Sequence, residues 1–144
     1  ALGVPHLGQG IYTATKHAVL GLSDVLRGEL PAHVQVSVVC PGLVHTELHN
    51  AGRNGPNGPA PAEALALGAK VMARGMDPLD IGRKTVAGVE KGEFLIMTHP
   101  YARTIAEKRW NDIDEAFKRA PSVENAAQYD VNSVVAAVLS GSGD

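Results

Sequence analysis

The 144-residue chain has a single cysteine, so it cannot form an internal disulfide or build a metal site from several cysteines. Its formal net charge is −2 at pH 7, which provides no basic surface for nucleic acid or for an anionic membrane. No apolar run approaches the roughly 20 residues that a membrane-spanning helix needs, and no signal peptide is recognisable. We therefore expect a soluble cytoplasmic protein with neither nucleic acid nor a membrane as its partner.

Metal binding is not predicted from the other candidate ligands either. His45 and Glu47 would share one side of a strand, whereas His45 and His49 would share one side of a helix. No single local structure presents all three side chains to one ion. The only thiol, Cys40, ends a predicted strand and is interpreted as a small buried apolar residue rather than a nucleophile.

The most informative spacing in the chain is that of Tyr12 and Lys16, four positions apart at the start of a predicted helix over residues 12–30. The helix is indicated by an apolar stripe at helical spacing, formed by Ile11, Ala14, Ala18, Leu22 and Val25. Residues at i and i+4 share a helix face, so a lysine there would favour the phenolate over the phenol. A phenol in that environment can give or take a proton. Taken alone, the pair also fits a boundary tyrosine beside a solvated lysine.

A second group of candidate residues follows a predicted strand over residues 34–39, which is rich in β-branched side chains. Pro41 and Gly42 come directly after it. Ligands of open α/β sheets bind beyond the carboxyl ends of the strands. Proline fixes a turn there and glycine lets the backbone approach a ligand closely.

The order of these motifs resembles the short-chain dehydrogenase/reductase family, with Tyr-x-x-x-Lys on a helix, a short hydrophobic strand, and then Pro-Gly-x-Val-x-Thr. The resemblance is strongest over residues 10–46 and continues more weakly to about residue 103. It implies an α/β fold, namely the C-terminal part of a doubly wound parallel-sheet (Rossmann-type) domain. It also implies hydride transfer between NAD or NADP and a small-molecule alcohol or carbonyl substrate, with Tyr12 as acid/base and Lys16 as its partner.

By the same resemblance, the residues that bind the cofactor would be Tyr12, Lys16, Pro41, Gly42, Val44 and Thr46. The family's glycine-rich turn and catalytic serine precede the tyrosine and do not occur in this sequence. We therefore expect the chain to be the C-terminal half of such an enzyme and to be inactive alone. The family packs this helix in a subunit interface, so a homo-oligomer, a dimer or tetramer, is expected. The alternative is a non-catalytic Rossmann-fold binding protein or an inactive fragment.

The rest of the chain is expected to complete this half-domain. Residues 50–61 are rich in glycine and proline and are predicted to form a loop, followed by a helix over residues 62–74. In the resembling family this region covers the substrate, which implies a lid at about residues 47–75. The half-domain is predicted to span residues 1–121, and residues 122–144 are predicted to be a C-terminal tail.

Three further elements are predicted from local signals. A helix should begin with Asp77 as its N-cap and Pro78 at its first position, and should stop at Gly92. A compact hydrophobic strand should follow at residues 94–98, and a charged helix at residues 101–119.

Overall fold

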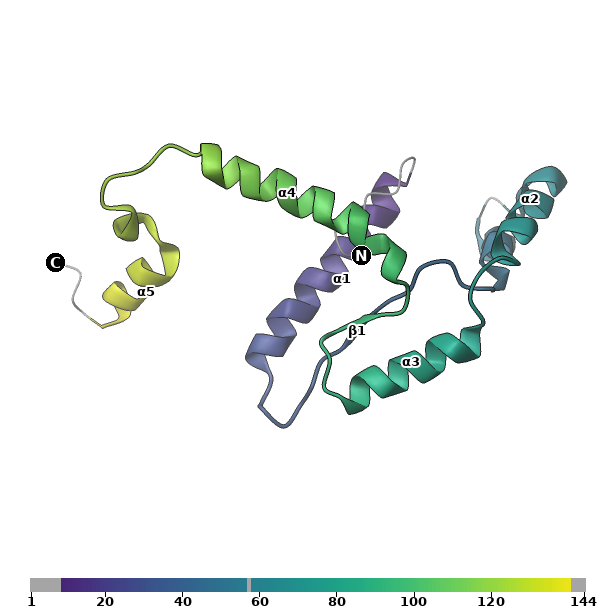
Figure 1. Ribbon diagram of the computed structural model, residues 1–144, viewed down its shortest axis with the longest axis horizontal. Helices are drawn as coiled ribbons and strands as arrows, with labels where there is room; N and C mark the ends of the chain where they lie inside the picture. Colours follow the sequence, from purple (N-terminus) through teal and green to yellow (C-terminus); the bar gives the residue numbers. More distant parts are fainter. Residues whose placement is uncertain (1–8, 57, 141–144) are drawn as a thin grey trace. The chain divides into compact units, whose positions relative to one another are not determined.

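The computed structural model describes residues 9–56 and 58–140, and the chain divides into two units, Ala1–Arg109 and Trp110–Asp144 (Figure 1). In chain order the elements are α1 (Gly10–Glu29), β1 (Val38–Cys40), the 3₁₀ helix η1 (Glu47–Asn54), α2 (Ala62–Met72), α3 (Pro78–Glu90), β2 (Leu95–Met97), the 3₁₀ helix η2 (Pro100–Ala102), α4 (Arg103–Arg119), the 3₁₀ helix η3 (Ala126–Tyr129) and α5 (Val131–Leu139). The boundary between the two units falls within α4, so each unit is described by itself.

The first unit contains a two-stranded parallel sheet of β1 and β2. Its register pairs Val38 with Leu95, Val39 with Ile96 and Cys40 with Met97. Val38 and Ile96 are the buried apolar residues of the described chain, with 8% and 2% exposure. Both predicted strands are confirmed, but they are shorter than predicted. Residues 34–37 lie outside β1, because the paired register begins at Val38.

Helix α3 packs against β2 through a glycine. A Cβ atom on Gly88 would lie 2.7 Å from Cγ1 of Ile96, so only glycine lets the helix approach this closely. The predicted start and end of α3 are also confirmed. The Asp77 side chain accepts a hydrogen bond of 2.7 Å from the Leu79 N–H, and Gly92 ends the region with a φ of +70°.

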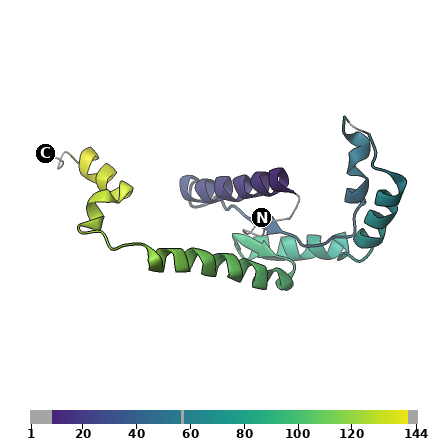
Figure 2. The ribbon, with the colours of Figure 1, turned by 90° about the horizontal axis from the view of Figure 1, so that it is seen from above.

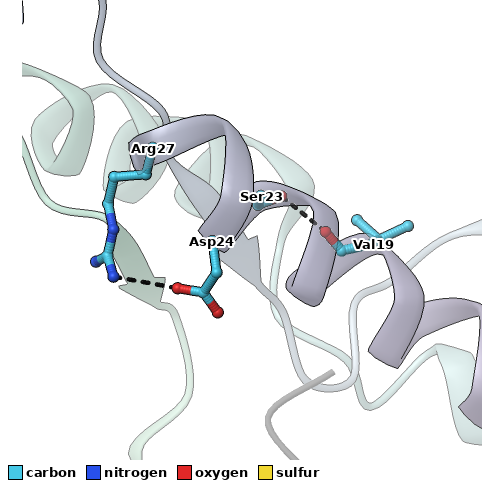
Figure 3. Close-up of polar contacts among 4 residues, drawn as sticks. All are labelled: Val19, Ser23, Asp24 and Arg27. Atoms are coloured by element: carbon cyan, nitrogen blue, oxygen red, sulfur yellow. Dashed lines mark hydrogen bonds and ion pairs between the residues drawn. The ribbon is translucent and has the colours of Figure 1, made fainter. Parts of the chain in front are cut away.

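Helix α1 is held near its C-terminal end by Arg27, whose guanidinium lies 3.8 Å from the centroid of the Phe94 ring. The same guanidinium forms an ion pair of 3.1 Å with Asp24, and the Ser23 hydroxyl donates to the Val19 carbonyl over 2.8 Å (Figure 3). The ring contact and the ion pair together fix the direction of the Arg27 side chain.

The apolar stripe predicted on α1 is exposed in the described residues. Ile11 and Leu22 of the predicted stripe are 83% and 60% exposed. The partly covered face is instead formed by Thr13, His17, Leu20, Ser23 and Leu26. Periodicity locates an apolar face, but burial requires a partner surface. The described sheet contributes only two strands.

The predicted loop over residues 50–61 is partly wrong, because η1 extends to Asn54. Thr46 begins this helix, and its hydroxyl accepts a hydrogen bond of 3.4 Å from the Leu48 N–H. Helix α2 packs beside η1 (Figure 2). A Cβ atom on Gly68 would lie 2.6 Å from Cβ of His49, so the glycine permits this contact.

In the second unit, the end of α4 is followed by η3 and α5. Lys118 lies 2.7 Å from Asp114 and 2.9 Å from Glu115. Asp130 caps α5 by accepting hydrogen bonds from the Ser133 hydroxyl and N–H, and these bonds lower the pKa of its carboxyl group. Within the described ranges, no helix has the length and apolar character needed to cross a bilayer.

Replacing Asp77 with alanine in the folded protein should lower the free energy of unfolding by about 1 kcal/mol, because the first turn of α3 loses its cap. Asp80→Ala is the matched control. Asp80 forms only an exposed pair with Arg83, and such pairs contribute less than about 1 kcal/mol. Urea unfolding measures both variants, and equal destabilisation would contradict the role of the cap.

Candidate active site

A pocket of about 970 Å³ lies between the start of α1 and the carboxyl end of β1. Its wall includes four of the predicted site residues, Tyr12, Lys16, Pro41 and Gly42. The two predicted motifs, which are 25 residues or more apart in sequence, therefore face the same space. Leu48 of η1 and Met72 of α2 also line it.

Tyr12 and Lys16 lie on the first turns of α1. The helix begins with the Thr13 N–H donating to the Gln9 carbonyl over 2.9 Å. Tyr12 is 47% exposed, and Lys16 Nζ lies 5.5 Å from the centroid of its ring. The four-residue spacing therefore does bring the cation to the aromatic ring, with the ammonium over the ring face. A phenol beside a cation at a pocket wall has the elements of a proton donor and acceptor.

The turn after β1 is held by the segment that follows β2. The Gly42 N–H donates to Nδ1 of His99 over 3.0 Å, and the Leu43 N–H donates to the Tyr101 hydroxyl over 3.2 Å. The Leu43 carbonyl accepts from Nε2 of His99 over 3.1 Å and from the Met76 N–H over 3.0 Å. Hydrogen bonds to His99, Tyr101 and Met76 thus fix the orientation of the backbone N–H and carbonyl groups of this turn.

Sequence reasoning missed His99 and Tyr101 as site residues. Tyr101 lines the 970 Å³ pocket, and His99 lines a neighbouring cavity of about 470 Å³ with Leu43. The usable signal was their position directly after a predicted strand. Carboxyl ends of parallel strands lie at the same edge of a sheet.

Val44 and Thr46, the other two predicted cofactor residues, lie beyond the pocket wall. Val44 pairs with Met76 in a parallel bridge, and the His45 N–H donates to the Met76 carbonyl over 2.9 Å. The Thr46 hydroxyl serves as the cap of η1. The structure therefore gives both residues a structural partner and does not bring their side chains to Tyr12.

The three residues considered as metal ligands do not converge. His49 Nε2 lies 3.8 Å from a carboxylate oxygen of Glu47, and Nδ1 of His49 is buried without a hydrogen-bond partner among the described residues. Within the described part of the chain, no group of three potential ligand side chains could hold a metal ion.

Burial raises the pKa of the Cys40 thiol. Its sulfur makes only a long contact of 3.8 Å with the Val38 carbonyl. A raised pKa keeps the group as a thiol at neutral pH, and the thiol is a weaker nucleophile than the thiolate.

Alkylation of Cys40 by iodoacetamide at pH 7.5 should therefore be slower in the folded protein than in urea. The rate should rise only at a pH above the usual range for thiols. Mass spectrometry of the peptide containing Cys40 measures both rates. Faster alkylation in the folded protein would show that the thiol is activated, contrary to its burial.

Comparison with known proteins gives a family match and several partial relatives. Residues 2–57 match the family model for short chain dehydrogenase. The chain is 44% identical over 39 residues to the dehydrogenase/reductase SDR family protein 7-like of Dictyostelium discoideum, covering 27% of this chain and 12% of that protein. It is 44% identical over 45 residues to the short-chain dehydrogenase anuF of Penicillium roqueforti (strain FM164), covering 31% and 16%.

A longer match, at 29% identity over 104 residues, joins the chain to the dehydrogenase/reductase SDR family member 7B of Bos taurus, covering 66% of this chain and 30% of the relative. The chain thus spans less than a third of the length of these relatives. No solved structure matches. The family match includes Tyr12, Lys16 and the Pro41-Gly42 turn, and together with these relatives it supports assignment of the chain to the short-chain dehydrogenase/reductase family.

Proposed function

We propose that this protein is an NAD(P)-dependent oxidoreductase that interconverts an alcohol and a carbonyl compound. The observation that carries the proposal is the shared pocket, which joins Tyr12 and Lys16 on α1 to the Pro41-Gly42 turn after β1. The match of residues 2–57 to the short chain dehydrogenase model supports it. The pocket's place at the carboxyl end of a parallel strand also supports it, because ligands bind there in α/β sheets.

The residues of this pocket fit a nicotinamide group. Gly42 is exposed and has no side chain, so its backbone can be approached closely. The pocket's volume of about 970 Å³ is of the size that small-molecule sites have. When bound, the nicotinamide accepts or supplies the hydride. Val44 and Thr46 belong to this proposal as further cofactor residues, although Thr46 would have to share its hydroxyl with the cap of η1.

Tyr12 would handle the proton of the reaction. During alcohol oxidation its oxygen takes the hydroxyl proton while the carbon gives up a hydride, and during carbonyl reduction it returns that proton to the oxygen. Lys16 would stabilise the negative charge that forms on the phenol, since its ammonium already lies at the ring. The protein thus supplies position and charge, and the cofactor supplies the redox chemistry.

The residues of the pocket wall also indicate the kind of substrate that would fit there. Leu48 and Met72 contribute apolar surface from η1 and α2, the region predicted to be a lid. We propose that this region covers the substrate and that the substrate carries an apolar part, because burying apolar surface there is favourable.

A homo-oligomer is part of the same proposal. Ile11, Leu22 and Val25 on α1 are each more than half exposed. A second copy that covered this face would remove apolar surface from water.

Tyr12→Phe in the full-length protein should lower kcat by about 10²–10⁴-fold, the usual contribution of general acid–base catalysis. The fold should be unchanged, since the ring is kept. Lys16→Met should also lower kcat, because the charge beside the phenol is lost. Steady-state assays that follow nicotinamide absorbance measure both effects.

The matched control is Tyr129→Phe, which removes the same hydroxyl from an exposed tyrosine in the second unit. It should retain normal kcat. A Tyr12→Phe variant with near-normal turnover would refute the role of the phenol. Wild-type protein that binds nicotinamide cofactor without turning over any alcohol or carbonyl compound would favour the non-catalytic alternative.

A further inference from the structure

The turn after β1 is bound to the end of β2 by backbone donors and acceptors whose roles are fixed. The pairing of Cys40 with Met97 leaves Thr98 and His99 opposite the turn. A backbone N–H can only donate, so Nδ1 of His99 must accept from Gly42. A carbonyl can only accept, so Nε2 of His99 must donate to Leu43.

Only one form of the imidazole satisfies both contacts. The neutral ring with its proton on Nε2 accepts at Nδ1 and donates at Nε2, whereas the other neutral tautomer reverses both roles. The Thr98 hydroxyl lies 2.8 Å from the same Nδ1 and 3.4 Å from the Cys40 carbonyl. Thr98 is only 2% exposed, so its own contacts lie away from water, whereas the contact of Gly42 with Nδ1 is exposed.

The absence of a side chain at position 42 makes this contact sterically feasible. A Cβ atom on Gly42 would lie 2.8 Å from Cγ of His99 and would also collide with the Tyr101 hydroxyl. The His99 and Tyr101 rings meet edge to face, with centroids 5.5 Å apart. The two rings therefore form one surface on which the turn rests.

We propose that His99, as the neutral Nε2-protonated imidazole, is a positioning residue that sets the orientation of the Pro41–Leu43 turn, and that Tyr101 holds the next backbone amide of the same turn. The consequence for cofactor binding rests on the proposed function, in which this turn forms part of the nicotinamide site. His99 itself lines the neighbouring cavity and acts through Gly42 and Leu43.

The test measures hydrogen exchange at the single amides of Gly42 and Leu43 in the full-length protein without cofactor. His99→Gln keeps a donor for the Leu43 carbonyl but removes the acceptor for Gly42. It should speed exchange at Gly42 by about fivefold, the scale of one hydrogen bond, and leave the Leu43 amide unchanged. Tyr101→Phe removes the acceptor for the Leu43 N–H, so it should speed exchange at Leu43 and leave the Gly42 amide unchanged.

His99→Asn offers an acceptor oxygen near the position of Nδ1 and should restore slow exchange at Gly42. His33→Ala, which removes an exposed histidine from the loop before β1, is the control and should alter neither amide. A merely structural role would loosen both amides together in every variant, and that result would overturn the proposal. Unchanged exchange at Gly42 in His99→Gln would overturn it as well.

Cofactor titration of the same variants separates this proposal from the proposed function. Weaker binding of NADH or NADPH by about fivefold in His99→Gln, with recovery in His99→Asn, supports both. The reciprocal exchange pattern with unchanged cofactor affinity would support the role of His99 and refute the assignment of this turn to the nicotinamide site.

Discussion

Two strands of three residues each, β1 and β2, determine where the parts of the candidate site meet. Because they pair in parallel, their carboxyl ends lie at the same edge of the sheet. A segment that contributes residues to the candidate site follows each strand. The Pro41-Gly42 turn follows the first strand, and His99 follows the second. A shift of this register by one residue would turn His99 to the other side of the sheet. The buried contact of Val38 and Ile96, together with Gly88 against Ile96, opposes such a shift.

Features that depend on neighbours in the sequence were predicted well. The cap at Asp77, the end of the helix region at Gly92 and the approach of Lys16 to Tyr12 each involve residues within a few positions of one another. Their geometry follows from helical spacing and backbone preference, which the sequence specifies directly. The positions of both strands were also predictable, because β-branched and apolar residues cluster there.

Two features that depend on distant residues were not predicted from local patterns. The contact of His99 with Gly42 joins residues 57 positions apart and exists only because of the strand register. The exposure of the apolar stripe on α1 has a related cause. An apolar stripe states which residues favour burial, but the surface that covers them must come from elsewhere. In the described chain, Ile11 and Leu22 remain exposed while His17 and Leu20 are partly covered.

The structure explains why position 42 in the Pro-Gly turn is a glycine, which the sequence alone did not explain. Among the described glycines, only Gly58 and Gly92 have a positive φ, so Gly42 is not required by a left-handed backbone. Steric contact instead sets the requirement, since any side chain at position 42 would meet the ring of His99 and the hydroxyl of Tyr101. The same absence of a side chain leaves the outer side of the turn open to the pocket. One small residue thus permits both the contact that orients the turn and the access that a ligand needs.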